Sequence, residues 1–155
     1  MAVRFAKESE LDRVNALRKQ VNDLHAAGRP DIFKPGFSKE LQDHIRTIWN
    51  DPRQRIVVDE RDGVLCGFAV LNHITRPENP FMRVRDYLDI DEFCVDKTCR
   101  RTGVGTELMT FIRVYAREQG FSKVELNMWE FNRDALQFYE AIGFSTYRRY
   151  MELEL

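Results

Sequence analysis

Residues 100–105 read Arg-Arg-Thr-Gly-Val-Gly and connect an apolar, strand-like run to a helical pattern that continues from Thr106. A glycine-rich turn between a strand and a helix directs several free backbone N–H groups toward one point, and such a turn holds phosphate without needing a particular side chain. Gly103 and Gly105 let a ligand approach the backbone closely, and the arginines add positive charge at the rim. The alternative is an ordinary tight connection, because a short glycine pattern alone is a weak signal.

Two segments downstream strengthen the phosphate interpretation. Residues 124–128 are a strand candidate, and residues 132–144 read Asn-Arg-Asp-Ala-Leu-Gln-Phe-Tyr-Glu-Ala-Ile-Gly-Phe. Together with the loop they resemble the acyl-CoA-binding half of the GNAT N-acetyltransferase superfamily. The loop matches its Gln/Arg-x-x-Gly-x-Gly/Ala motif, and the second segment matches its Asn-x-x-Ala-x-x-Phe-Tyr-x-x-x-Gly-Phe signature. The match runs from Asp89 to Phe144 with both motifs in the right order, whereas the N-terminal half resembles the family mainly in its order of elements.

This resemblance implies an enzyme that moves the acetyl group of acetyl-CoA, as co-substrate, to a primary amine by direct attack in a ternary complex. It places the pyrophosphate on the loop and the pantetheine arm beside the strand before it. Asn132 is also a good helix N-cap, and Cys94 is expected to be a small buried hydrophobe rather than a catalytic thiol. The residues implied for acetyl-CoA are Phe93, Cys94, Val95, Arg100, Arg101, Thr102, Gly103, Val104, Gly105, Thr106, Asn132 and Tyr139.

Acetyl transfer needs a neutral amine and a proton for the leaving thiolate, which defines the candidate catalysts. Tyr139 matches the tyrosine of the family's Phe-Tyr pair, and its phenol is the candidate acid; the alternative is a core aromatic at helical spacing. Asp89 and Glu92 are the candidate bases, since a partly buried carboxylate has a raised pKa. Strict alternation predicts Asp89, Asp91 and Phe93 on one face of the strand and Glu92 on the other. A water chain without a dedicated base remains the alternative.

The candidate acceptor site is the loop of residues 26–37, which in the superfamily lies between the first two helices and commonly lines this site. Arg29 and Asp31 can bind a carboxylate and an amine, and Phe33 is apolar for an exposed loop. The alternative is that these side chains only anchor the loop. The sequence does not separate a peptide N-terminus, a lysine, a polyamine, an aminoglycoside or a free amino acid as acceptor.

Length and composition predict one globular domain over residues 1–155, and the resemblance implies that it is an acetyltransferase domain. The net charge of −1 gives no global attraction to nucleic acid or anionic lipid, so neither partner is expected. The three cysteines form no C-x-x-C pair, and we expect reduced thiols and no metal. Because no apolar leader or bilayer-length run is present, a cytoplasmic location is expected.

Periodicity and turn signals predict the order of elements. Strands are expected at 3–5, 55–59, 64–74, 84–95 and 124–128, with a final strand pair within 144–155. Ser9 and Ser38 are expected to cap the first two helices, and Asp62-Gly63 is a strong hairpin signal. This order predicts an α/β (α+β) single domain with a mixed central sheet and helices on both faces, and the resemblance implies the same order as a GNAT-like fold.

Three further hypotheses remain open. A non-catalytic acyl-CoA-binding or sensor module would keep the loop and lose turnover. A nucleotide-binding P-loop is disfavoured, because the chain lacks the Gly-Lys-Ser/Thr ending of that motif. A homodimer can form through the last strands, where Tyr147, Tyr150 and Met151 are available.

Overall fold

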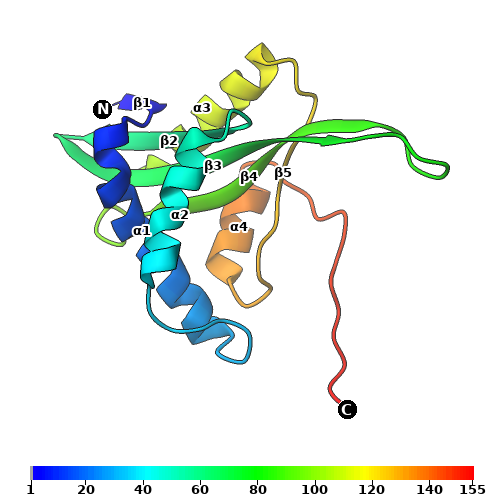
Figure 1. Cartoon of the computed structure of the whole chain (residues 1–155), viewed down its shortest axis with the longest axis horizontal. Helices are drawn as coiled ribbons and strands as arrows, with labels where there is room; N and C mark the ends of the chain where they lie inside the picture. The colour runs from blue at the N-terminus through cyan, green and yellow to red at the C-terminus, as the bar shows by residue number, and fades with distance from the viewer. Residues whose placement is uncertain (1) are drawn as a thin grey trace.

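A five-stranded sheet forms the centre of the molecule (Figure 1), and the structure, a computed structural model, describes residues 2–155. In sheet order the strands are β1 (Ala2–Phe5), β2 (Gln54–Arg61), β3 (Val64–Arg76), β4 (Arg85–Val95) and β5 (Val124–Leu126). Neighbouring strands are antiparallel except β4 and β5, which are parallel. The expected mixed sheet is confirmed.

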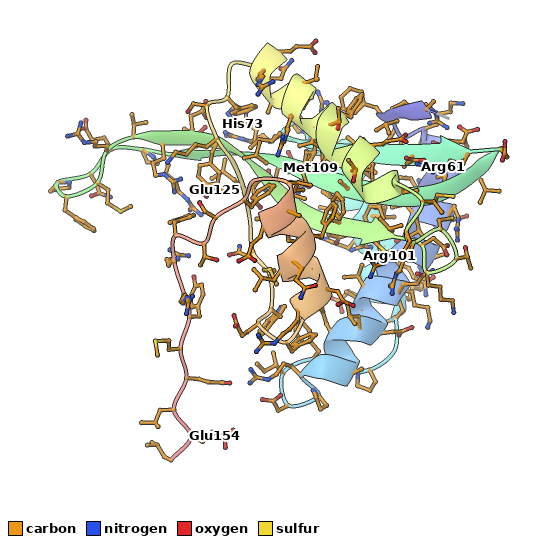
Figure 2. The ribbon with its side chains drawn as sticks, turned by 180° about the vertical axis from the view of Figure 1, so that it is seen from behind. Arg61, His73, Arg101, Met109, Glu125 and Glu154 are labelled. Carbon is orange, nitrogen blue, oxygen red and sulfur yellow. The ribbon has the colours of Figure 1, made fainter. Side chains whose placement is uncertain are left out.

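Helices cover both faces of this sheet. After a short 3-10 turn, η1 (Glu8–Glu10), α1 (Leu11–Gly28) and α2 (Lys39–Asn50) lie on one face, in front of the strands in Figure 1. The other face carries α3 (Val104–Glu118) and α4 (Arg133–Ala141), which the view from behind presents (Figure 2). Each pair of helices encloses its own apolar cluster against the sheet. None of the helices within residues 2–155 is both long enough and apolar enough to cross a bilayer.

Local signals in the sequence account for several element boundaries. The Ser38 hydroxyl accepts a hydrogen bond from the Leu41 N–H at 3.3 Å and begins α2 as expected. Asp62 and Gly63 both have positive φ, at 50° and 77°, which matches the type I′ turn of a two-residue hairpin between β2 and β3.

Two local expectations are wrong. Ser9 does not cap the first helix: it lies inside η1, because the Glu10 carboxylate accepts the Lys7 N–H at 2.7 Å and fixes one 3-10 turn before α1 begins. The expected strand pair within residues 144–155 is also absent, and residues 145–155 are exposed. A strand needs a hydrogen-bonded neighbour, and no strand within residues 2–155 pairs with this segment.

The seating of α3 on the sheet depends on a glycine in β3. A Cβ built on Gly67 would lie 2.7 Å from a Val104 methyl group and 3.0 Å from both the Cys94 carbonyl oxygen and a Leu108 methyl group. Because one of these neighbours is backbone, the contact cannot be relieved by a rotamer change. Gly67 thus lets the first turn of α3 approach the sheet.

We therefore expect Gly67→Ala to lower the free energy of unfolding by about 1–3 kcal/mol through overpacking. For a chain of this size that is a fall in melting temperature of roughly 2–4 °C per kcal/mol, measured by thermal unfolding. Val114→Ala, on the exposed side of α3, is the control and should change little. An unchanged melting temperature in Gly67→Ala would show that α3 is not seated at this point.

Candidate active site

The loop between β4 and α3 exposes backbone amides at the start of a helix. Arg101 and Gly103 both adopt left-handed backbone, with φ of 64° and 89°, and Gly103 is the residue before α3. No side chain caps α3, so the N–H groups of its first turn, Val104, Gly105 and Thr106, remain available to an anion. Arg100 and Arg101 are exposed, and Figure 2 shows Arg101 at this loop. The loop thus has a left-handed turn followed by an uncapped helix N-terminus, and phosphate binding by this loop stays a prediction.

The loop is braced by a residue that the sequence did not single out. Arg61, at the end of β2, donates a hydrogen bond to the Thr102 carbonyl oxygen at 2.7 Å. Its guanidinium is in turn paired with the fully buried Asp59 at 3.1 Å and with Glu107 of α3 at 3.2 Å. Figure 2 shows Arg61 beside the loop at the end of the hairpin. No sequence motif marks Arg61, because the loop and α3 residues that it contacts, Thr102 and Glu107, lie more than forty residues away.

The start of the loop is anchored by Asp96. Its carboxylate pairs with Arg13 of α1 at 2.6 Å and accepts hydrogen bonds from the N–H and hydroxyl groups of Thr98 at 2.8 Å. Burial opposes its charge, but the bonds from Thr98 and Arg13 prevail and hold the pKa of Asp96 well below its usual range. Asp96 therefore remains ionised and ties the loop to α1.

The absence of a side chain at Gly105 allows α3 and α4 to pack closely against each other. A Cβ at Gly105 would lie 3.0 Å from the ring of Phe138 in α4 and 3.6 Å from a methyl group of Val95. The missing side chain thus brings α4 against the start of α3. Of the two glycines in the motif, Gly103 supplies the left-handed turn and Gly105 supplies the close packing.

A β-bulge changes which side chains of β4 share a face. Val70 of β3 pairs with Glu92 and Leu71 pairs with Ile90, so Asp91 is an extra residue in β4. Ile90 and Phe93 consequently both lie with the α3–α4 cluster, and Glu92 points to α1. The expected shared face of Asp89 and Phe93 is therefore wrong: Asp89 and Glu92 share the face toward α1 and α2.

Beyond the bulge, one edge of β4 has no strand beside it. β5 pairs with β4 only from Leu88 to Ile90, and β5 ends at Leu126. Residues 91–95 of β4, which we call the free edge, are bonded to β3 on their other side and have no strand partner on this one within residues 2–155. Backbone groups of Phe93, Cys94 and Val95 that point to this edge can bind an extended ligand.

Tyr139 lies in α4 among the aromatic residues next to the free edge. Its ring contacts those of Phe93, Phe138 and Phe144 at centroid distances of 6.0, 5.4 and 5.7 Å. Burial, with a smaller contribution from Cys94, raises the pKa of Tyr139 to about 12, so the phenol keeps its proton at neutral pH. Asn132 caps α4 by accepting the Ala135 N–H at 3.3 Å, as expected.

The two candidate bases have different surroundings. Asp89 is half-buried, and burial together with the carboxylates of Asp91 and Glu125 raises the pKa of Asp89 to about 6. Glu92 is instead held by Arg18 of α1, which is buried and approaches both carboxylate oxygens, at 2.9 and 3.1 Å. Asp89 thus has the ionisation that a base at neutral pH needs, whereas the Glu92 oxygens are already engaged by a cation.

The buried thiol of Cys94 has no nucleophilic character. Burial raises the pKa of Cys94 to about 12, and the side chain packs in the α1–α2 cluster. Cys66 and Cys99 are also free thiols.

The loop between α1 and α2 meets the segment that follows β5. Phe33 stacks on His25 at 5.0 Å and meets Trp129 edge-on at the same distance, and the ring of Phe131 lies against the backbone of Gly28. Burial lowers the pKa of His25, which keeps its ring neutral in this cluster. The sequence prediction included Phe33 but missed Trp129 and Phe131, whose only signal was their position directly after the strand expected at 124–128.

Arg29 and Asp31 are paired with one another rather than free for a ligand. The two side chains form a double hydrogen bond at 2.9 and 2.8 Å, and Arg29 also pairs with Glu152 at 2.8 Å and lies over the Trp129 ring. The structure therefore brings Arg29, Asp31 and Phe33 together as one braced loop.

Comparison with known proteins finds a curated acetyltransferase and a solved structure that matches the whole chain. Over 123 residues, 77% of this chain and 52% of that protein, the chain is 26% identical to L-ornithine N5-acetyltransferase NATA1 of Arabidopsis thaliana. The chain thus spans about half the length of this curated relative. A variant of the BH1408 protein of Bacillus halodurans superposes with a TM-score of 0.94, at 26% identity and with both chains fully covered.

A third comparison concerns the fold alone. The aminoglycoside N-acetyltransferase AAC(6')-Iy, solved in complex with CoA, superposes with a TM-score of 0.77 at 17% identity, covering 99% of this chain and 93% of that one. The family model described as acetyltransferase (GNAT) family matches residues 18–144, which include the loop, the free edge and Tyr139. This chain belongs to the GNAT acetyltransferase family.

Proposed function

We propose that this protein is an acetyl-CoA-dependent N-acetyltransferase, in one domain of residues 1–155, that acetylates the primary amine of a small molecule. The observation that carries the proposal is the free edge of β4, with uncapped amides of α3 at one end, Tyr139 on one side and Asp89 on the other. The named activities of NATA1 and AAC(6')-Iy, and the CoA bound to the latter, support both the reaction and the co-substrate.

We expect acetyl-CoA, the acetyl donor, to be bound mainly by backbone groups rather than by side chains. The amides of residues 101–106 would hold the pyrophosphate, since a helix N-terminus favours negative charge. The pantetheine would lie along Phe93, Cys94 and Val95, and an N–H of this stretch would stabilise the oxyanion. Asn132, which begins α4, would border the same arm.

Proton movements would use groups on opposite faces of the sheet. The cationic amine would lose one proton to Asp89, directly or through water, and the neutral nitrogen would then bond to the acetyl carbon while the carbonyl π electrons move to oxygen. As the carbonyl re-forms, the carbon–sulfur bond would break with its electron pair leaving on sulfur, and the nitrogen would release its second proton through water to that thiolate. Tyr139 would donate a hydrogen bond to the thiolate as it forms. With a pKa of about 12 the phenol is a weaker acid than an ordinary thiol, so hydrogen-bond donation is favoured over complete proton transfer.

The acceptor is proposed to be a cationic small-molecule amine. Negative charge gathers near the end of the paired part of β4 and β5, from Asp89, Asp91 and Glu125. Glu125 forms an ion pair with Arg85, and Arg76 acts on Asp89. Phe33 and Trp129 would form an aromatic wall that suits the alkyl part of such a molecule. The Arg29–Asp31 pair would hold this wall in place.

The direct test is thiol release from acetyl-CoA with a panel of amines: ornithine, lysine, a polyamine, an aminoglycoside and a peptide N-terminus. The proposal predicts turnover with at least one small cationic amine and none with the peptide. Binding of acetyl-CoA without turnover on any amine would favour the non-catalytic acyl-CoA-binding module instead.

We expect Tyr139→Phe to reduce kcat by about 100-fold, because it removes the hydrogen bond to the thiolate and keeps the ring. The contacts with Phe93, Phe138 and Phe144 are retained, so the Kd for CoA measured by calorimetry should change little. Tyr115→Phe, which also removes a phenol hydroxyl but lies in α3 against Phe5, is the matched control and should keep the wild-type kcat. Equal loss of binding and turnover, or no loss of either, would remove Tyr139 from the mechanism.

Asp89→Asn should change the pH profile as well as the rate. Below a pH of about 6, Asp89 and the amine must both lose a proton before they react, so log kcat/KM should rise with pH at a slope of about 2. Above a pH of about 6 only the amine still has to lose a proton, and the slope should be about 1. The variant should be at least about 100-fold slower and show only the slope of 1. Asp86→Asn, on the same strand and exposed, should keep both slopes. Persistence of the break near pH 6 in Asp89→Asn would assign it to another group.

The melting temperature of Asp89→Asn is a second measurement that tests the role of Asp89. A carboxyl group whose pKa is raised by folding contributes stability below its unfolded pKa of about 4, and that contribution is lost as the pH rises through 6. Above pH 6 the ionised group opposes folding, so the neutral amide should not lower the melting temperature there. A rate loss with an intact melting temperature would therefore be chemical in origin.

A further inference from the structure

Cys66 and Cys99 are two thiols that the proposed reaction does not use, and both belong to the apolar cluster between the sheet, α3 and α4. The register of β2 and β3 shifts at Cys66, which lies between the paired residues Leu65 and Gly67 and has no partner of its own in β2. Such a bulge changes the direction of a side chain. Cys66 consequently lies on the face of the sheet that α3 covers, where Gly67 meets the first turn of that helix.

A tight turn after β4 brings Cys99 back to Cys66. The Asp96 N–H donates to the Cys66 carbonyl oxygen at 2.8 Å, and the Cys99 N–H donates to the Asp96 carbonyl oxygen at the same distance. The Asp96 carboxylate holds this turn through the N–H and hydroxyl groups of Thr98. Burial, followed by a hydrogen bond with the Cys99 thiol, raises the pKa of Cys66 to about 11. The two thiols are therefore neighbours in space, although they belong to different elements.

The two thiols differ in their access to solvent. Cys66 is buried, whereas Cys99 is partly exposed. Its raised pKa keeps Cys66 protonated at neutral pH, so an oxidant in solution meets Cys99 first. The third thiol, Cys94, packs in the α1–α2 cluster on the opposite face of the sheet and is not part of this pair. An accessible thiol beside a buried one is the arrangement in which the first thiol is oxidised and the second resolves it into a disulfide.

We propose that Cys66 and Cys99 form a reversible disulfide when the protein meets a small-molecule disulfide, and that this bond displaces the loop between β4 and α3. The Cys99 thiolate attacks one sulfur of the small disulfide, forms a mixed disulfide and releases one thiol. The Cys66 thiolate then attacks the Cys99 sulfur and releases the second thiol. The two protein sulfurs lose two electrons, which the small disulfide gains, and the protons of the two protein thiols pass to the two released thiols.

The bond affects the loop because Cys99 is connected to it. The Cys99 carbonyl oxygen accepts the Thr102 hydroxyl, and the Thr102 carbonyl oxygen accepts a hydrogen bond from Arg61. A disulfide brings two sulfur atoms closer than any non-bonded contact allows. Cys66 is fixed in β3, between β2 and β4, so Cys99 moves and the left-handed turn at Arg101 moves with it.

The displaced loop should bind acetyl-CoA more weakly, since a binding site must hold its groups within about 0.5 Å of their productive positions. This consequence rests on the proposed function, whereas the disulfide and the movement of the loop do not. The experiments therefore measure the bond, the loop and the ligand separately.

Oxidised glutathione is the probe for the bond, and peptide mapping by mass spectrometry identifies the products on the full chain. The wild type should give a peptide pair joined through Cys66 and Cys99, and dithiothreitol should restore both thiols. Cys94→Ala should form the same bond. Cys99→Ser should form none, and Cys66→Ala should stop with glutathione attached to Cys99. A wild type that keeps both thiols, or that carries glutathione on Cys99 without forming the bond, would overturn the proposal.

Hydrogen exchange tests the movement of the loop without any ligand. The amides of residues 100–106 should exchange faster in the oxidised wild type than in the reduced one, and at the same rate in Cys99→Ser with or without oxidised glutathione. Exchange that the bond leaves unchanged would show that the loop is not displaced.

Calorimetry with acetyl-CoA tests the consequence for binding. The Kd of the oxidised wild type should be at least about tenfold higher than that of the reduced protein, and the Kd of Cys99→Ser should not respond to oxidised glutathione. Equal Kd values for the two forms of the wild type would refute the effect on binding. A reduced wild type that does not bind acetyl-CoA would instead contradict the proposed function, and the peptide map and the exchange rates would still decide the disulfide and the loop.

Discussion

The extra residue at Asp91 is the constraint on which the rest of the site depends. It changes the alternation of β4, so that Asp89 and Glu92 point to α1 and α2 while Phe93 and Val95 point to α3 and α4. It also stands where β5 ceases to pair with β4. Because β5 ends at Leu126, the backbone groups on this side of residues 91–95 have no strand partner within residues 2–155 and are available to a ligand.

Rigid connections on both sides hold this strand and its loop in place. Arg18 fixes Glu92 from α1, Arg13 fixes Asp96 at the start of the loop, and Arg61 fixes Thr102 from the end of β2. All three are arginines that bind oxygen atoms distant in sequence, and their rigid planar groups suit this positioning task. The loop can therefore present its amides without the ligand having to order it, which favours tight binding of a charged co-substrate.

The sequence predicts the parts of the structure whose causes are local. The Gly103 turn, the Ser38 and Asn132 caps and the Asp62-Gly63 hairpin each follow from a few adjacent residues, and the structure has all of them. The bulge, the Arg61 brace and the Phe33–Trp129 contact depend on tertiary partners, so periodicity could not reveal them. The last segment has a strand pattern without a strand, because pairing depends on a neighbour as well as on alternation.

The central claim is that the loop and the free edge of β4 bind acetyl-CoA, and thermal unfolding with added ligand tests it most directly. At about 100 times its Kd, a ligand that binds only the folded chain should raise the free energy of unfolding by about 2.7 kcal/mol, which is roughly 5–10 °C in melting temperature. Acetyl-CoA should produce this shift and ATP should not. No shift with acetyl-CoA would mean that residues 100–106 are only a turn between strand and helix, and the proposed reaction would lose its basis.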